Sequence, residues 1–583
     1  MLHTLTRSLR ENKGPALVTV LLSALEVVFE IVIPLFMSNL IDFGIEGGSM
    51  AAVWKFGAFL LLLAAFQLAT GVLAARIAAR ASVGFAANLR EDMYDKVQTF
   101  AFSNIDKFST ASIVTRLTTD TTNVQNAFQM LMRMAIRAPV MLVFSMVVSF
   151  RISRDISMTF LIILPILALA LFFIIRSVFP VFSRVFRTYD ELNNVVQENV
   201  RGIRVVKSFN QERHEIGKFG AISERIYQDF SKGERLITLN APLMQFCIYT
   251  CMIVISWLGA KAIIASGNDP ALGLTTGNLT ALITYTMQIL SSLMMLSMVF
   301  AMLTISLSSA RRIAEVLEER SDIPQPEQPV MTVRDGAVDF DHVSFVYASK
   351  ADKKVLDDID LHIRSGETIG IIGGTGASKS SLVQLIPRLY DVTGGKLTLG
   401  GVDVRDYDLD TLRGAVAMVL QKNELFSGTI AENLRWGNEN ATDEQLRHAC
   451  KLACADEFIS AMPDGYDTHI EQGGTNVSGG QKQRLCIARA LLKKPKVLIL
   501  DDSTSAVDTR TDAQIQQALS TYIPDTTKII IAQRISSVQN ADRIVVLDDG
   551  HIDAVGCHDE LLRTCEIYRE VYESQQKGGE DDA

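Results

Sequence analysis

The stretch IIGGTGASKSSL, residues 371–382, decides how the C-terminal part of the chain folds. A short apolar run ends in a turn of small residues, and the segment from Leu382 onward is predicted to be helical. This order comes close to the phosphate-binding pattern G-x-x-x-x-G-K-[ST], in which loop N–H groups and the helix dipole attract phosphate. Lys379 would reach the outer phosphates and the Ser380 hydroxyl would bind Mg2+. Ser378 departs from the pattern, which has glycine before the lysine.

The composition divides the chain into two unlike parts. With 583 residues it is too long for one domain, and its 48% hydrophobic content indicates a membrane protein. The apolar residues lie mainly before residue 310, and the remainder is typical of a soluble α/β protein. The net charge of −9 argues against nucleic acid as the main partner.

The N-terminal part is predicted to cross the membrane repeatedly. Basic residues among apolar ones at 1–14 predict an amphipathic elbow helix on the cytoplasmic face. The connections 41–52 and 267–277 carry no Lys or Arg, whereas the long connections 79–127 and 181–239 carry many. The positive-inside rule therefore predicts a multi-pass protein of the cell membrane with a cytoplasmic N-terminus. Six stretches are long enough to span the bilayer: 15–40, 53–78, 128–150, 156–180, 240–266 and 278–305.

The two long connections are predicted to be helices that continue beyond the membrane. No glycine occurs from residue 85 to 201, so little interrupts a helix there. We expect these helices to be joined by short segments near 103–107 and 211–218 and to present a docking surface for another domain.

A proline-rich linker separates the two parts, because SDIPQPEQPV follows the last span. Beyond it, apolar strands alternate with helical segments, as in an α/β domain. The predicted fold is an all-α six-helix transmembrane domain fused to an α/β phosphate-loop nucleotide-binding domain. The predicted divisions are the elbow helix 1–14, the transmembrane domain 15–315, the linker 316–334, the nucleotide-binding domain 335–574 and a disordered tail 575–583.

Two further motifs fit a nucleotide site. KVLILDD, residues 496–502, is an apolar strand that ends in two acids. Asp501 is placed to hold Mg2+, and Asp502 stands where a general base would polarise the attacking water. VSGGQKQR, residues 477–484, begins a helix with Ser478 as N-cap and two glycines that let a phosphate approach closely.

Together these three elements resemble the ATP-binding cassette (ABC) transporter family, and specifically exporters with six spans fused to one nucleotide-binding domain. The resemblance includes VLQKNELFSGTIAENL, SAVD and QENVRGIRVVKSF and covers nearly the whole chain. It implies ATP and Mg2+ as cofactors, with Tyr347 stacking on adenine and Ser380, Gln421 and Asp501 at the metal. The residues that it assigns to nucleotide are Tyr347, Gly373, Gly374, Thr375, Gly376, Ala377, Ser378, Lys379, Ser380, Ser381, Gln421, Asp501, Ser478, Gly479, Gly480, Gln481 and Asp508.

The family architecture implies two such halves, with each ATP held between one half's phosphate loop and the other half's signature. Three positions depart from the family pattern. The catalytic glutamate is replaced by Asp502, the switch histidine by Gln533, and the loop glycine by Ser378. Independent drift is the alternative explanation. The pattern resembles the degenerate half of heterodimeric bacterial multidrug exporters, whose intact signature serves a complete partner half.

The cargo is the least defined part of the prediction. We expect ATP-driven export of an amphiphilic, drug-like molecule across a membrane whose lipid surrounds the spans. Glu26 and Glu30 lie inside the first span and could attract a cationic substrate, although pairing with Arg133 and Arg137 is the favoured interpretation. The alternatives are a regulatory ATP-binding subunit, an exporter-fold importer of a metal chelate, and a lipid or peptide exporter.

Overall fold

The computed structural model describes residues 1–269, 273–347 and 354–580. The chain divides into two compact units, each with its own core. The first contains Met1–Gln98 and Thr110–Glu319, and the second contains Thr99–Ser109 and Arg320–Ala583. The short segment Thr99–Ser109 therefore leaves the helices that flank it in sequence and belongs to the second unit.

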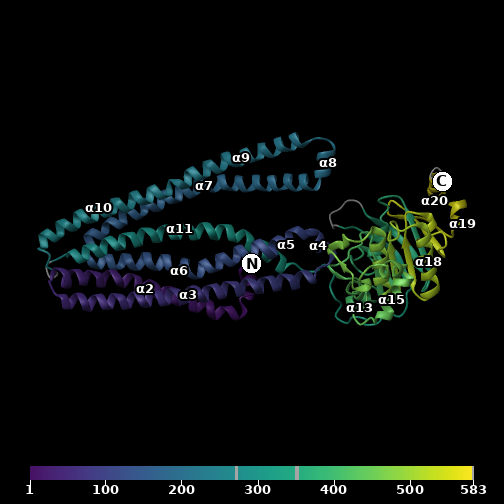
Figure 1. The fold of residues 1–583 in the computed structure, drawn as a ribbon, viewed down its shortest axis with the longest axis horizontal. Coiled ribbons are helices and arrows are strands. Elements are labelled where there is room, and N and C mark those ends of the chain that lie inside the picture. Colours follow the sequence, from purple (N-terminus) through teal and green to yellow (C-terminus); the bar gives the residue numbers. More distant parts are fainter. Residues whose placement is uncertain (270–272, 348–353, 581–583) are drawn as a thin grey trace. The chain divides into compact units, whose positions relative to one another are not determined.

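The first unit is entirely helical in its described residues (Figure 1). Six of its helical stretches are long and apolar enough to cross a membrane, with mean hydropathies from 1.8 to 3.0, as the predicted fold requires. Its elements are α1 (Leu2–Arg7), η1 (Arg10–Asn12), α2 (Lys13–Asn39), η2 (Leu40–Glu46), α3 (Met50–Gln98), α5 (Thr110–Thr115), η3 (Arg116–Asp120), α6 (Thr121–Ile152), α7 (Arg154–Arg201), α8 (Ile203–Ser208), α9 (Glu212–Thr238), α10 (Asn240–Ser266) and α11 (Thr276–Glu318).

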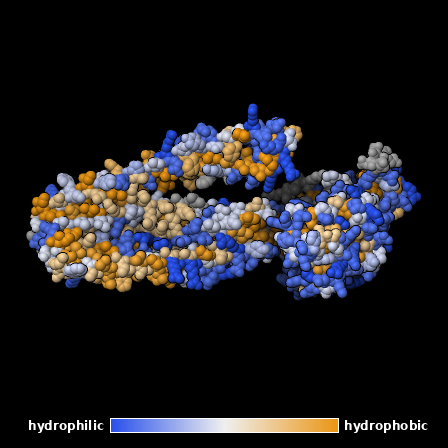
Figure 2. Space-filling view, viewed as in Figure 1, coloured by the Kyte–Doolittle hydropathy of each residue, from blue (hydrophilic) through white to orange (hydrophobic). Residues whose placement is uncertain are grey.

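Large apolar side chains remain uncovered along these helices. Leu61 and Ile264 are 76% and 82% exposed, and Figure 2 shows hydrophobic residues gathered over the helices of this unit. In water such a surface would be unfavourable, whereas lipid tails solvate it at no cost. Within the unit, α2, α3, α6 and α11 pack together, and α7 packs on α9 and α10. The unit therefore has the architecture of a membrane domain.

The second long connection lies earlier than we predicted. The helices were expected to join near 211–218, but α7 ends before Gly202 and the short helix α8 follows at once. Helix α9 already begins at Glu212. Glu212 and Glu215 fall in its first turn, where acidic side chains complement the helix dipole, so 211–218 is a helix start. The first connection holds α4 (Phe102–Phe108), which includes the predicted 103–107.

The second unit is an α/β domain with two main sheets. Its strands are β1 (Val338–Phe345), β2 (Leu356–Ile363), β3 (Thr368–Gly373), β4 (Gly394–Leu399), β5 (Val402–Asp403), β6 (Val416–Val419), β7 (Gly428–Thr429), β8 (His469–Ile470), β9 (Val497–Asp501), β10 (Thr527–Ile531), β11 (Arg543–Asp548) and β12 (His551–Gly556). An antiparallel sheet has the order β2-β1-β4-β5, and a six-stranded sheet has the order β12-β11-β3-β10-β9-β6. In the larger sheet only the pairing of β11 with β12 is antiparallel.

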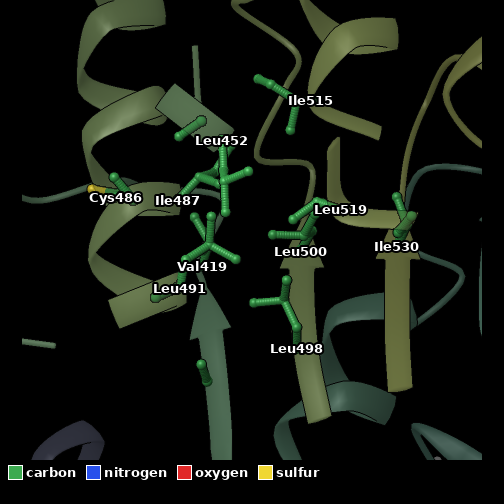
Figure 3. Packing of buried hydrophobic residues seen from close by; sticks show 14 of the residues in the cluster. Val419, Leu452, Cys486, Ile487, Leu491, Leu498, Leu500, Ile515, Leu519 and Ile530 are labelled. Carbon is green, nitrogen blue, oxygen red and sulfur yellow. The ribbon is translucent and has the colours of Figure 1, made fainter. Parts of the chain in front are cut away.

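Helices and the antiparallel sheet cover the larger sheet on both faces, so its central strands are buried along their whole length. All five residues of β9 and of β10 are buried. In Figure 3, Ile487 and Leu491 of α17 lie against Val419 of β6. The other elements of this unit are α4, α12 (Lys379–Gln384), α13 (Leu409–Ala415), α14 (Ile430–Arg435), α15 (Asp443–Leu452), α16 (Asp456–Ser460), η4 (Gly465–Asp467), η5 (Gln472–Gly474), α17 (Gly479–Leu492), α18 (Thr509–Tyr522), η6 (Ile535–Ser537), α19 (His558–Thr564) and α20 (Glu566–Glu580).

The C-terminal segment differs from the disordered tail expected from residue 575. Helix α20 continues to Glu580, and residues 581–583 lie outside the described part of the chain. The Gln575 side chain accepts a hydrogen bond from the Ile535 backbone and donates one to the Gln533 carbonyl. These two bonds hold the start of the expected tail against the domain.

Candidate functional site

The sequence-predicted residues meet at one edge of the larger sheet. Strands β6, β9, β10 and β3 are parallel neighbours, so their carboxyl ends lie together. The phosphate loop follows β3, Asp502 follows β9, Gln533 follows β10 and Gln421 follows β6. In open α/β sheets, ligands bind outside the carboxyl ends of the strands. The fold thus brings together four segments that are far apart in sequence.

The phosphate loop leads directly into α12, which begins at Lys379 and not at the predicted Leu382. The Lys379 ammonium donates to the carbonyls of Gly373 and Gly374, at 2.8 Å each. Burial lowers the Lys379 pKa. Gly376 has a φ of +86°, a conformation that favours glycine, and a Cβ added there would meet open space. The loop therefore holds a cation against its own carbonyls and leaves open space beside Gly376.

Ser378 is the N-cap of α12 in an unfavourable conformation. Its φ of 66° and ψ of 22° place it in the left-handed region, and its side chain makes no capping hydrogen bond. A residue with a Cβ is strained there, whereas glycine is not. Serine in place of the pattern's glycine therefore introduces backbone strain into the phosphate loop.

Ser380 and Asp501 provide two oxygens that suit a magnesium ion. The Ser380 hydroxyl donates to Asp501 Oδ1 at 3.0 Å, so the two side chains converge. Burial, together with the neighbouring Asp502 charge, raises the Asp501 pKa, although Ser380 and Lys379 oppose this shift. A second positive charge at this point would favour the ionised carboxylate. Mg2+ commonly takes one or two carboxylates together with substrate phosphates, and this donor set fits that preference.

Asp502 is held by two amide side chains. Gln533 Nε2 donates to Asp502 Oδ2 at 2.7 Å, and Gln421 Nε2 lies 3.4 Å from the same oxygen. The Asp502 backbone has a φ of 47°. The Asp502 carboxylate thus faces neutral donors, and neither amide can accept a proton near pH 7.

The helix that begins with the VSGGQ motif is well formed. Ser478 caps α17: its hydroxyl accepts from the Gln481 N–H at 3.3 Å, and Gln481 Oε1 accepts from the Ser478 N–H at 2.9 Å. This reciprocal pair is a capping box. A Cβ on Gly480 would lie only 2.8 Å from the Ala506 carbonyl, so the SAVD segment packs directly on this turn. Glycine is required there by packing.

The SAVD segment, residues 505–508, is tied to the same helix. Gln483 of α17 donates to Ser505 Oγ at 3.3 Å and accepts from the Ala506 N–H at 3.0 Å. Asp508 caps α18 by accepting from the Thr511 N–H at 3.0 Å. That bond and others from backbone N–H groups lower the Asp508 pKa.

Tyr347 lies beside the phosphate-loop helix. Its hydroxyl is 2.8 Å from Ser381 Oγ and 3.5 Å from Gln384 Oε1. The residue is 45% exposed, so part of its side chain remains accessible to a ligand. Residues 348–353, which follow it, lie outside the described part of the chain. The remaining predicted residues, Thr375, Ala377 and Gly479, lie in the phosphate loop or the first turn of α17.

The charged residues in the membrane unit confirm the favoured pairing in part. Arg137 of α6 donates to Glu26 Oε1 at 2.7 Å and to Glu30 Oε2 at 2.6 Å, both on α2. One guanidinium thus serves two carboxylates. Among the described residues, Arg133 makes no ion pair with them.

Sequence reasoning missed three polar or aromatic residues at the site. Gln483 ties α17 to SAVD, Gln575 holds the Gln533 backbone, and the Tyr390 ring packs on Tyr347 with centroids 5.0 Å apart. A glutamine on a helix belongs to no sequence pattern that reveals such contacts. The nearest clue was QKQR, which places Gln483 two residues after Gln481.

Comparison with known proteins agrees with this architecture. Residues 16–294 match the ABC transporter transmembrane region, and residues 356–505 match the ABC transporter domain. The chain is 36% identical over 558 residues to the uncharacterized ABC transporter ATP-binding protein YfiB of Bacillus subtilis, covering 96% of each chain. It is 33% identical over 580 residues to the uncharacterized ABC transporter ATP-binding protein Rv1273c of Mycobacterium tuberculosis, covering 99% of this chain and 98% of the relative.

A solved structure has the same fold. A bacterial Atm1-family ABC exporter with ATP bound superposes with a TM-score of 0.82 at 24% identity, covering 97% of this chain and 99% of that one. The two matched regions and the relatives show that this chain belongs to the ABC transporter family, whose members are membrane ATPases and translocases, and its fold is that of an ABC exporter half-transporter with six helices long and apolar enough to cross a membrane.

Proposed function

We propose that the chain is the degenerate half of a heterodimeric ABC exporter that moves amphiphilic, drug-like molecules out of the cell. Its own phosphate loop holds Mg2+ and ATP for long periods. Helix α17, which begins with the signature motif VSGGQ, completes a faster site on a second, catalytically complete half-transporter. The nucleotide-binding domain and the N-terminus lie in the cytoplasm.

The observation that carries the proposal is the environment of Asp502. Its Oδ2 accepts from Gln533 at 2.7 Å and faces Gln421 at 3.4 Å. Aspartate is one methylene shorter than glutamate, and a misplacement of about 1 Å can cost on the order of 10²-fold in rate. Gln533 also lacks the positive charge that a histidine can bring to the γ-phosphate. Both substitutions leave the groups that bind ATP in place and weaken the groups that act on the attacking water.

The binding groups of the same site support retention of ATP. Lys379 is directed at the loop, Ser380 and Asp501 offer oxygens for Mg2+, and Tyr347 is partly exposed. When bound, the metal would supply positive charge to the phosphates. In this chain, Lys379 would bind the outer phosphates and Ser380 would orient the metal through its hydroxyl.

The geometry of α17 supports a role in the partner's site. Its first turn presents the N–H groups of Gly479 and Gly480, at the positive end of a 14-residue helix. The capping box and the Gln483 bonds to SAVD fix that turn. A helix turn that binds the phosphate of a nucleotide held by another chain needs rigidly placed donors of this kind.

The membrane cargo follows from the composition of the first unit. Its spans are apolar, and the Glu26–Glu30–Arg137 cluster holds two carboxylates for one guanidinium. A membrane domain with that charge balance suits an amphiphile and favours a cation over an anion. The substrate class is accordingly an amphiphilic or drug-like molecule.

Purification with its neighbour tests this function. We expect the chain to co-purify with a six-span half-transporter encoded in an adjacent reading frame. The pair, in inside-out vesicles, should accumulate fluorescent amphiphilic dyes when ATP is supplied. A panel of dyes, lipids and peptides separates the drug-like cargo from the others. Uptake by the chain alone, equal to that of the pair, would contradict the heterodimer.

A further inference from the structure

We propose that Tyr390 links the base-binding ring of the ATP site to helix α4, so that adenine at Tyr347 fixes the position of α4. The inference rests on the adenine role proposed above for Tyr347. Tyr390 is thus a positioning residue, which acts through Tyr347 and through α4 without touching the phosphates.

Three aromatic rings form a compact group at the edge of the site. Tyr390 and Tyr347 have centroids 5.0 Å apart at an interplanar angle of 88°. Phe345 contacts both, with centroids 4.8 Å from Tyr347 and 5.6 Å from Tyr390. Edge-to-face packing of this kind prefers particular angles, so a ring that turns to stack on a base disturbs its neighbours.

The same tyrosine holds α4. The Tyr390 hydroxyl donates to Asp106 Oδ2 at 2.9 Å, and the Phe102 ring lies 6.0 Å from the Tyr390 ring. Burial and Asp106 together raise the Tyr390 pKa, so the hydroxyl remains a donor at neutral pH. One side chain therefore contacts both the base-binding ring and the short helix.

Helix α4 is well anchored on this unit by other bonds. Asn104 Nδ2 donates to the Arg320 carbonyl at 3.0 Å, and Ser103 Oγ donates to Asp322 at 2.9 Å. Asn104 is 1% exposed. These bonds reach the chain after α11, whereas the Tyr390 bond leads toward the nucleotide site. Along the chain, α4 lies between α3 and α5.

Hydrogen exchange of residues 100–109 tests the link in the full chain, in lipid nanodiscs. Saturating Mg–ATP should slow exchange in α4 by about fivefold, the factor that one net hydrogen bond is worth. Mg–tripolyphosphate, which fills the phosphate loop without a base, should leave exchange unchanged. Equal slowing by tripolyphosphate would overturn the inference.

Substitution separates the link from binding. Tyr390→Phe keeps the ring and removes the donor, so ATP affinity should stay within about twofold while the slowing of α4 is lost. Asp106→Ala should have the same effect, and the double variant no more than either alone. Tyr522→Phe, an exposed tyrosine on α18, is the matched control and should change neither. Slowing that survives in Tyr390→Phe, or loss of ATP binding in that variant, would overturn the inference.

The two proposals fail in different ways. Tyr347→Ala should weaken ATP binding about tenfold, the effect of losing one base-stacking ring. Unchanged affinity in that variant would remove the adenine role itself. Weakened affinity, together with normal slowing of α4 in Tyr390→Phe, would remove only the link.

Discussion

Two serines are the N-caps of the two helices α12 and α17, and their backbone conformations differ sharply. Ser478 has an extended backbone, with φ −68° and ψ 159°, and forms a capping box at the start of α17. Ser378 has a left-handed backbone and no capping bond at the start of α12. The difference shows that α17 starts at an unstrained, capped serine. Backbone strain and departures from the family pattern occur together around the phosphate loop. Such strain persists only where the surrounding structure imposes it.

The largest expected effect comes from disturbing the well-formed region. Gly480→Ala would place a Cβ 2.8 Å from the Ala506 carbonyl and push the SAVD segment away from α17. We expect ATP hydrolysis by the assembled pair to fall on the order of 10²-fold, as when an aligned donor is lost from a catalytic site. Phosphate release measures it. Gly414→Ala, where a Cβ meets open space, is the matched control and should be neutral.

Repairing the substituted region should raise activity. Asp502→Glu combined with Gln533→His restores a longer carboxylate and a protonatable ring beside the phosphate loop. We expect turnover at the chain's own site to rise about tenfold or more, because alignment and charge are both recovered. Asp502→Glu alone should gain little, since Gln533 still occupies the carboxylate. Equal turnover in the double variant and the parent would show that the substitutions are tolerated drift.

The two serines themselves give a matched pair of stability measurements. Ser478→Ala removes the cap of α17 and should lower the free energy of unfolding by about 1 kcal/mol. Ser378→Gly relieves a left-handed backbone and should raise it by up to about 1 kcal/mol. Thermal unfolding of the full chain in detergent measures both. A loss of stability in Ser378→Gly would contradict the account of strain at the phosphate loop.

The smallest effect concerns pH at the cap of α18. Hydrogen bonds from Thr511 and other backbone groups lower the Asp508 pKa below its usual range. The stabilisation is therefore present above the usual value near 4 and is lost as the pH falls through the lowered pKa. We expect Asp508→Asn, which still caps but does not titrate, to flatten the decline in melting temperature between about pH 5 and pH 3. An unchanged decline would show that other carboxylates cause it.

Sequence reasoning reached the strands and their end residues more surely than the contacts between loops. The apolar run that ends at Asp501 and the one before the phosphate loop were predicted as strands, and both are strands. Ser380 and Asp501 were each assigned to Mg2+, and their side chains lie 3.0 Å apart. The helix start at Lys379 was missed by one turn, because Ser378 hides the usual glycine break. The tail was expected to be disordered because its composition is polar, but Gln575 finds two backbone partners that no composition reveals. Tyr390 was missed for the same reason, since ring contacts depend on three-dimensional packing.

The most direct test is ATP turnover by the purified chain alone in lipid nanodiscs, with bound nucleotide measured in parallel. The account predicts that the chain retains Mg–ATP while turning over at least about 10²-fold below the typical enzyme value of about 10 per second. Adding the complete partner half should restore fast hydrolysis, because α17 then meets an intact phosphate loop. Rapid turnover by the chain alone, near that typical value, would contradict the degenerate-half assignment.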